Sequence, residues 1–266
     1  MRAGPSSGVR RARAVMAAAC GTVLMALAGC GGPVGGDGAK NGVPGAPRRT
    51  AGPAAGPSRA ERPRPAAVPG DDPAALPGVG ARLRAAIPAD SGQALVVYGE
   101  GRDASDATVV LYGLGGDGWR PLGGWPAHNG RNGWTTDHHA GDGRSPVGVF
   151  TVTDAGGVLP DPGTRLAYTH GRAYYAPPSS WSPAYQHDFD YVIAIDYNRL
   201  RGVPPHDATR PWGGARGGSI WLHLDHGGGT SACIGLSAEA MRFLLRTLDP
   251  ARDPVVVMGD REDLLA

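Results

Sequence analysis

Hydrophobic residues between positions 90 and 260 occur in short runs, separated by glycine, proline and polar residues. Runs of four to eight residues that are rich in valine, isoleucine and aromatic side chains are typical of β-strands. The pattern predicts strands over residues 93–98, 107–114, 148–153, 191–197, 218–224 and 254–258. The frequent glycines and prolines keep these elements short, so the pattern indicates a mainly β fold.

One segment has the pattern of a helix instead. Met241, Leu244, Leu245 and Leu248 form an apolar stripe at helical spacing. Ser237 precedes the stripe and is a good N-cap residue, Glu239 favours the positive end of the helix dipole, and Pro250 lies beyond the stripe. We therefore expect one helix that covers the sheet with its apolar face.

The composition divides the chain into three parts. The last part, residues 74–266, has the composition of one globular domain with a sizeable core. Residues 30–73 are rich in Gly, Pro, Ala and Arg and have no aromatic residue, so we expect a disordered tether. Residues 1–29 hold a basic head followed by fifteen uncharged residues, 14–28, which are too few to span a bilayer and indicate a signal peptide.

The end of this signal carries a cysteine that changes the expected location. Cys30 follows Leu27, Ala28 and Gly29, an arrangement that resembles the lipobox of bacterial lipoproteins, in which the cysteine is lipidated. The alternative is ordinary cleavage at small residues, with Cys30 incidental. The first interpretation predicts an exported protein anchored to the outer face of the cytoplasmic membrane and facing the cell wall.

Removal of the signal also changes the charge. The full chain has 26 Lys and Arg against 24 Asp and Glu, and residues 1–29 hold four of the arginines and no acidic residue. The mature chain would therefore carry 22 basic and 24 acidic side chains, a net charge of −2. We expect no nucleic-acid partner, because such a partner requires a clustered basic face.

The candidate chemistry lies in a histidine and a cysteine. The chain has three cysteines, and Cys20 and Cys30 both belong to the export segment, so we expect Cys233 to have no disulfide partner in the folded part. His223 ends a predicted strand ten residues before Cys233, with three glycines, 227–229, between them. A neighbouring imidazole would supply the thiolate that a nucleophilic cysteine needs. The bland alternative is a buried cysteine that packs as a small hydrophobic residue.

Two motifs strengthen the first alternative. Residues 230–234, TSACI, follow His223, and residues 141–150, GDGRSPVGVF, lie upstream. Together, in this order and with the closing strand at 255–259, they resemble the L,D-transpeptidase (YkuD-like) catalytic domain over about residues 92–259. The resemblance implies a YkuD-like β-sandwich with one covering helix after the cysteine. The family has glycine where this chain has Ala232, and an Arg or Asn after the cysteine that is unmatched here.

The resemblance also implies a reaction. Cys233 would attack a peptidoglycan stem peptide and form a thioester, His223 would move the proton, and the acyl group would pass to an amine, with no cofactor and no metal. The other expected oxyanion or substrate-binding residues are Gly229, Thr230, Ser231, Ala232, Arg144 and His226. An L,D-carboxypeptidase, in which water replaces the amine, and a catalytically silent wall-binding lipoprotein are alternatives.

Several other residues have open interpretations. His223, Asp225 and His226 match half of a metallo-β-lactamase motif, which leaves a zinc hydrolase as a further alternative. His138 and His139 are expected to be exposed loop residues. The six tryptophans are expected to pack in or around the core, with Trp134 and Trp212 as candidates to line a groove, and Tyr174 and Tyr175 mark a loop expected to cover the site.

Overall fold

The computed structural model describes residues 75–266. The strands are β1 (Gln93–Gly99), β2 (Asp106–Gly115), β3 (Gly118–His128), β4 (Trp134–Thr135), β5 (Ser145–Pro146), β6 (Gly148–Thr151), β7 (Asp154–Gly157), β8 (Ala167–His170), β9 (Val192–Ala194), β10 (Trp221–Leu224), β11 (Ile234–Leu236) and β12 (Val255–Asp260). The α-helices are α1 (Ala81–Ala86), α2 (Arg172–Tyr175), α3 (Ala238–Thr247) and α4 (Arg261–Leu265). The predicted signal peptide and tether lie outside the described residues.

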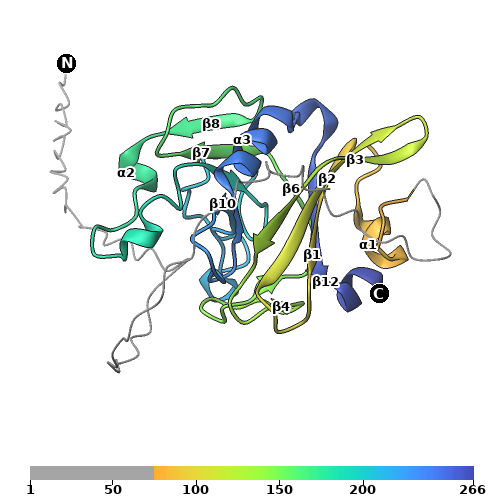
Figure 1. Ribbon diagram of the computed structural model, residues 1–266, viewed down its shortest axis with the longest axis horizontal. Coiled ribbons are helices and arrows are strands. Elements are labelled where there is room, and N and C mark those ends of the chain that lie inside the picture. The colour runs from red at the N-terminus through yellow and green to blue at the C-terminus, as the bar shows by residue number, and fades with distance from the viewer. Residues whose placement is uncertain (1–74) are drawn as a thin grey trace, which may run out of the picture.

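Ten of the strands form one mixed sheet in the order β6-β12-β1-β2-β3-β11-β10-β9-β7-β8. Most neighbours are antiparallel, but β1 pairs with β12, β10 with β11 and β7 with β8 in parallel. Figure 1 shows β1, β2 and β12 at one end of the molecule and β7 and β8 at the other. This arrangement confirms the expected mainly β fold.

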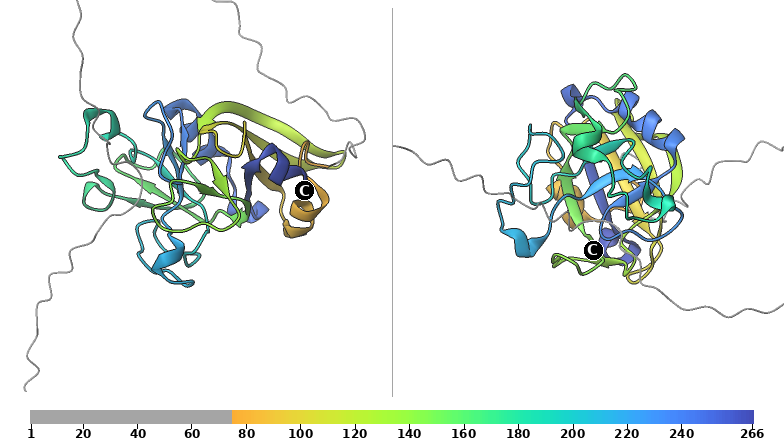
Figure 2. Two further views of the ribbon diagram at one scale, coloured as in Figure 1. Left: turned by 90° about the horizontal axis from the view of Figure 1, so that it is seen from below. Right: turned by 90° about the vertical axis from the view of Figure 1, so that its left-hand side faces the viewer.

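Three apolar clusters cover the faces of this sheet. The largest joins residues of β1 and β2, such as Leu95 and Val109, to residues of β9 to β11, such as Ile193, and to α3. Because both halves of the sheet contribute to one core, the sheet folds round on itself (Figure 2). A second cluster lies on the opposite face of β1, β2 and β12 and includes Leu83 of α1 and Leu264 of α4.

The third cluster lies on the other face of β9 and β10 and contains Val192, Trp221 and Cys233. It is covered by Tyr175 of α2 and by Phe189, both from the segment between β8 and β9. The predicted cysteine and the predicted covering loop are therefore part of one cluster.

The expected helix is present as α3. The Ser237 hydroxyl accepts a hydrogen bond from the Ala240 N–H at 3.2 Å, which is the predicted N-cap. Met241, Leu244 and Leu245 are buried within the largest cluster. None of the helices within residues 75–266 is long and apolar enough to cross a membrane.

The observed strands differ from the predicted ones mainly where glycine and proline occur. All six predicted strands are present, but three are shorter: residues 148–153 yield only β6, residues 191–197 only β9, and residues 218–224 only β10. The long strand β3 was not predicted, since it contains Pro121, Pro126 and two adjacent glycines. It pairs with β2 through an irregularity between Leu111 and Tyr112, which absorbs one extra residue.

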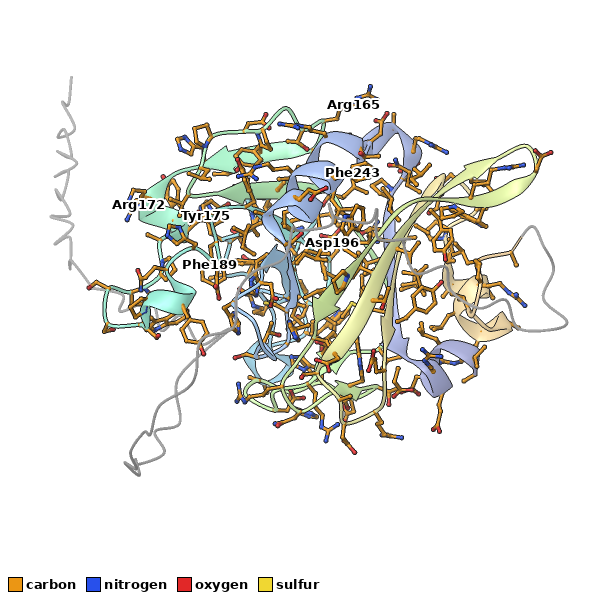
Figure 3. All side chains as sticks on the ribbon, viewed as in Figure 1. Arg165, Arg172, Tyr175, Phe189, Asp196 and Phe243 are labelled. Atoms are coloured by element: carbon orange, nitrogen blue, oxygen red, sulfur yellow. The ribbon has the colours of Figure 1, made fainter. Side chains whose placement is uncertain are left out.

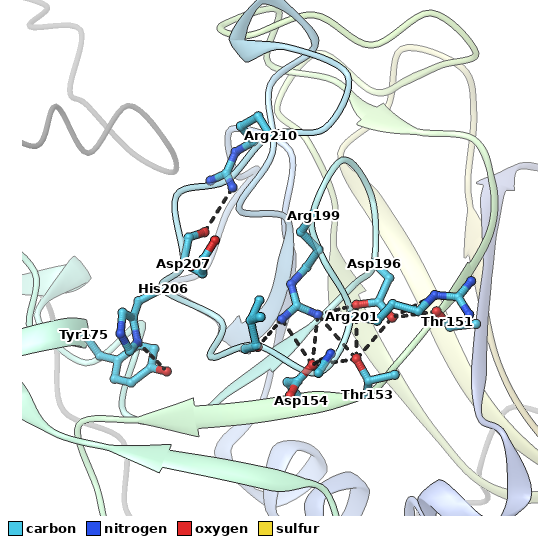
Figure 4. A network of polar contacts seen from close by, with 12 residues as sticks. Thr151, Thr153, Asp154, Tyr175, Asp196, Arg199, Arg201, His206, Asp207 and Arg210 are labelled. Atoms are coloured by element: carbon cyan, nitrogen blue, oxygen red, sulfur yellow. Dashed lines mark hydrogen bonds and ion pairs between the residues drawn. The ribbon is translucent and has the colours of Figure 1, made fainter.

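The loop that follows β9 is anchored by a buried ionic network (Figure 4). Arg199 forms ion pairs with Asp154 and Asp196, and all three side chains are at most 3% exposed. Thr151 and Thr153 donate further hydrogen bonds to Asp196, at 2.5 and 3.3 Å. Burial raises the pKa of Asp196, although its hydrogen bonds act in the opposite direction. Arg199 therefore compensates two carboxylates that burial disfavours.

We predict that Arg199→Met lowers the free energy of unfolding by roughly 3–5 kcal/mol, because it leaves buried carboxylates without a counter-ion. Denaturant unfolding of the purified domain at pH 7 measures this change. The control is Arg201→Met, since Arg201 reaches Asp196 only at 4.0 Å and its side chain is 68% exposed. Equal effects of the two substitutions would contradict the structural role of the network.

Candidate functional site

The site is built on the parallel pair β10 and β11. Leu222 lies opposite Ile234, and both side chains belong to the largest core cluster. Side chains alternate along a strand, so Trp221 and His223 point to the other face, and Trp221 shares the third cluster with Cys233. Phe189 contacts both Trp221 and His223, with ring centroids 5.4 Å apart in each case. His223 on β10 and Cys233, which directly precedes β11, are thus on the same face of the sheet.

The His223 imidazole is fully buried and held in one orientation. Its Nδ1 lies 2.7 Å from the carbonyl oxygen of Leu224, which is a hydrogen bond that Nδ1–H donates. The other nitrogen, Nε2, is buried and has no hydrogen-bond partner among residues 75–266. Burial lowers the pKa of His223, so the ring is neutral near pH 7 and Nε2 carries the basic lone pair.

Cys233 is also covered. The residue is 1% exposed, and its Sγ lies 3.6 Å from the carbonyl oxygen of Ser219. Ser219 has a φ of 53°, a left-handed conformation that is uncommon for a residue with a side chain. Nucleophilic chemistry at this residue therefore requires that the sulfur become exposed to substrate.

Hydrogen bonds from backbone and side-chain groups fix the segment before Cys233. Thr230 donates its hydroxyl to the carbonyl oxygen of Cys233 at 2.6 Å, and its own N–H donates to the carbonyl oxygen of Asn129 at 2.9 Å. Ser145 donates its hydroxyl to the carbonyl oxygen of Ala232 at 2.7 Å and accepts the N–H of Gly130 at 2.9 Å. The two sequence motifs therefore meet: the residues around Ser145 orient the backbone that precedes Cys233.

The backbone at Gly229 and Ala232 limits which side chains fit in this segment. A Cβ at Gly229 would lie 2.6 Å from the Cα of Arg131, so only glycine fits there. Ala232 is not among the residues with positive φ, so the alanine in place of the family's glycine causes no left-handed strain. Ser231 receives a hydrogen bond from Arg131 at 3.3 Å. The expected oxyanion role of these residues stays a prediction.

Arg144, another expected substrate-binding residue, is engaged by the protein. Its guanidinium forms an ion pair with Asp103 at 2.7 Å and donates to the carbonyl oxygen of Trp134 at 3.1 Å. A substrate carboxylate would have to compete with Asp103 for this side chain.

His226 lies beside His223, with the rings nearly parallel and their centroids 6.3 Å apart. Its Nδ1 is 3.0 Å from Asp188, which is 2% exposed, and the hydrogen bond to this carboxylate raises the pKa of His226. The Asp188 carbonyl also accepts the N–H of Leu224 at 2.8 Å. The pair thus fastens the segment after α2 to the end of β10.

The zinc alternative finds no support in this arrangement. Among residues 75–266, no group of three or more His, Cys, Asp or Glu side chains is placed to hold a metal ion. Asp225, which was part of the candidate motif, lies 2.9 Å from Nδ1 of His128 on β3.

The remaining candidates divide between core and surface. His138 is 5% exposed and packs edge-on against Tyr197, so the expectation that it is exposed is wrong, whereas His139 is exposed. Trp134 is 1% exposed and lies against Gly99, which excludes it from a groove, while Trp212 is 61% exposed. Figure 3 shows Tyr175 and Phe189 on the same side of the molecule, and both belong to the cluster that contains Cys233.

Sequence reasoning missed two residues of the site. Ser145 belongs to the upstream motif but was not predicted as a site residue, although a serine followed by proline in a glycine-rich segment is a signal for a fixed turn. Asp188 gave no signal, because its pairing with His226 joins residues 38 positions apart.

Comparisons with known proteins agree with the motifs. The family model described as YkuD, L,D-transpeptidase catalytic domain, matches residues 94–257. Comparison with curated protein sequences finds no match. A solved structure titled "Structure of Bdellovibrio bacteriovorus Bd1075" matches with 13% identity and a TM-score of 0.35, over 63% of this chain and 47% of that chain. This chain thus covers about half the length of that protein, and a likeness this weak carries no argument.

We predict that Asp188→Asn lowers the pKa of His226, because the carboxylate that favours its protonated form is removed. A raised folded pKa stabilises the fold below the unfolded value of about 6.5, and this stabilisation is lost as pH rises through the folded pKa. Asp188→Asn should therefore weaken the pH dependence of stability in that window. Imidazole NMR titration and unfolding between pH 5 and 9 measure both effects.

The control for this prediction is Asp190→Asn. Asp190 pairs at 2.9 Å with His187, whose side chain is 79% exposed, and belongs to the same segment as Asp188. An unchanged His226 titration in Asp188→Asn, or an equal change in Asp190→Asn, would contradict the assignment.

Proposed function

The chain belongs to the L,D-transpeptidase catalytic domain family, and on that premise we propose that it is a cysteine acyltransferase that cross-links peptidoglycan stem peptides. The observation that carries the proposal is the common face of His223 and Cys233, with the His223 Nδ1 bonded to Leu224 and Nε2 left with its lone pair. Members of this family act on the cell wall, which implies an extracytoplasmic location.

The first half-reaction forms an acyl-enzyme. His223 Nε2 accepts the proton of the reduced Cys233 thiol, and the thiolate attacks the carbonyl between the diamino acid and the terminal D-Ala of a tetrapeptide donor. The carbonyl oxygen becomes an oxyanion, for which the backbone N–H groups of residues 231–233 are the proposed donors. As the C–N bond breaks, His223 returns the proton to the D-Ala amine, and a thioester with Cys233 remains.

The second half-reaction releases the acyl group. An amine of a neighbouring stem peptide loses a proton to His223 and attacks the thioester carbonyl. The C–S bond breaks, and the thiolate of Cys233 recovers the proton from His223. Water in place of the amine would give an L,D-carboxypeptidase, and the present residues favour neither acceptor.

A catalytically silent wall-binding domain is the second candidate, and a specific observation favours it. Cys233 is 1% exposed, so a substrate cannot reach the sulfur in this conformation. The active form of the proposed enzyme is therefore one in which the third cluster opens around Cys233.

We predict that the reduced protein forms a covalent adduct with a carbapenem or a donor tetrapeptide, and that Cys233→Ala forms none. Intact-protein mass spectrometry measures the adduct, and product analysis with and without an amine acceptor separates transfer from hydrolysis. His223→Ala should fold but lose at least roughly 100-fold in the rate of acylation, since general-base assistance is worth about that much.

His139→Ala serves as the control, because this histidine is exposed and lies outside the site. An adduct that persists in Cys233→Ala would contradict the assignment of the nucleophile. A reduced wild-type protein that binds peptide but never forms an adduct would favour the silent domain.

The proposed location rests on Cys30, which lies outside the described residues. We propose that the mature protein is a lipoprotein attached to the membrane through this residue. Cys30→Ala should move the protein from the membrane fraction to the soluble exported fraction, because the lipid anchor cannot be added. Fractionation followed by immunoblotting measures this, with Cys20→Ala as the control; unchanged fractionation of Cys30→Ala would contradict the anchor.

A further inference from the structure

Arg210 and the candidate nucleophile Cys233 both contact the same residue, Ser219. The Arg210 Nη2 donates a hydrogen bond to the hydroxyl of Ser219, and the carbonyl oxygen of Ser219 lies 3.6 Å from Cys233 Sγ. A Cβ at Gly218 would lie 2.2 Å from the Arg210 Nε, so the guanidinium packs directly on the backbone that enters β10.

The loop that carries Arg210 is fixed by the ionic network described above. Arg199 anchors its start, and Asn198 donates to the carbonyl oxygens of Gly213 at 3.1 Å and Gly217 at 2.6 Å. Figure 4 shows Arg210 on the same loop as Arg199, with His206 and Tyr175 nearby. Tyr175 belongs to the cluster that contains Cys233, so the loop and the cluster meet at the same place.

The Arg210 guanidinium is not neutralised by an ion pair. Among residues 75–266, no carboxylate lies within 4.0 Å of it: its Nη1 donates to the carbonyl oxygens of Asp207 at 3.1 Å and Thr209 at 2.8 Å. Three of its five N–H groups are thus used, and two have no acceptor in this part of the chain. The Asp207 carboxylate accepts the N–H of Thr209 instead, at 2.8 Å.

The other arginines near the site differ from Arg210 in this respect. Arg144 is paired with Asp103 at 2.7 Å. Arg131 donates to Ser231 at 3.3 Å but is exposed, so water competes for its remaining N–H groups. Arg210 is half-buried, and burial is the main cause that lowers its pKa, which indicates that its charge is poorly solvated. A half-buried cation without a carboxylate partner is a binding group for an anionic ligand.

We propose that Arg210 binds a carboxylate of the substrate, namely the C-terminal carboxylate of the donor stem peptide; this inference rests on the proposed function. In such a donor the terminal carboxylate is only three bonds from the carbonyl carbon that Cys233 would attack. A group that recognises it must therefore lie near the sulfur, and Arg210 contacts Ser219, the residue whose carbonyl oxygen lies 3.6 Å from Cys233 Sγ. The role is to orient the scissile bond, and the expected Arg or Asn after the cysteine, which this chain lacks, is not needed for it.

Equilibrium binding tests this proposal without any turnover. In the Cys233→Ala protein, isothermal titration calorimetry compares a tetrapeptide that ends in a free carboxylate with the same peptide ending in a carboxamide. We expect the acid to bind ~10- to 100-fold more tightly than the amide, since a charge-assisted bidentate contact is worth about that much. The ratio should fall to near one when Arg210→Gln is added and should be partly retained by Arg210→Lys.

Arg131→Gln in the same background is the matched control, because Arg131 also donates to a serine beside Cys233 but is exposed. It should keep the acid-to-amide ratio of the parent. A ratio that is unchanged by Arg210→Gln, or that is lost in Arg131→Gln instead, would overturn the proposal. Because the ratio is measured within one protein, partial misfolding of a variant does not alter it.

Two further experiments are needed. One distinguishes the C-terminal carboxylate from a side-chain carboxylate of the donor, and the other distinguishes failure of carboxylate binding from failure of acylation. Some diamino acids of the donor carry a side-chain carboxylate, which Arg210 could bind instead, and a donor with lysine at that position lacks it. Loss of the Arg210-dependent acid-to-amide ratio with the lysine peptide would overturn the assignment to the C-terminal carboxylate. A protein that shows the expected acid-to-amide ratio but is never acylated would contradict the proposed transpeptidase reaction and would still support carboxylate binding by Arg210.

Discussion

The register between β10 and β11 is the constraint on which the site depends. Leu222 and Ile234 pair inside the main core, and burial of both side chains holds the register, because a shift of one residue would turn every side chain to the other face. With the register held, His223 and Cys233 necessarily share the opposite face. The hydrophobic core thus positions the candidate chemistry without contacting it.

A second layer of polar contacts fixes the backbone around this pair. Ser145 and Thr230 donate hydrogen bonds to the carbonyl oxygens of Ala232 and Cys233, and Leu224 orients the His223 ring. These bonds tie the upstream motif to the cysteine segment across 87 positions of sequence. The residues are therefore pre-organised, while the aromatic cluster above Cys233 controls access to the sulfur.

The charged side chains around the site lie on loops, and buried ion pairs fix these loops in place. Asp188 fastens His226 beside His223, and Arg199 fastens the loop that ends at Ser219. The same loop brings Arg210 to the hydroxyl of Ser219, whose carbonyl oxygen lies 3.6 Å from the sulfur of Cys233. Burying a charged group costs free energy unless the group is paired. The Arg210 guanidinium has no carboxylate partner among residues 75–266, and this is the feature that most favours a bound anion.

Local patterns in the sequence determined the mainly β class, the six predicted strands, the capped helix α3 and the two motifs that identify the family, because alternation, capping and glycine content are properties of neighbouring residues. The same patterns failed for β3, whose prolines and glycines are tolerated because its pairing with β2 and β11 supplies the hydrogen bonds. The burial of Cys233 and His138, the pairing of Arg144 with Asp103 and of His226 with Asp188, and the approach of Arg210 to Ser219 were decided by tertiary structure alone. Each joins or covers residues by packing of distant segments, and the energy of such contacts depends on solvent exclusion, which no local pattern encodes.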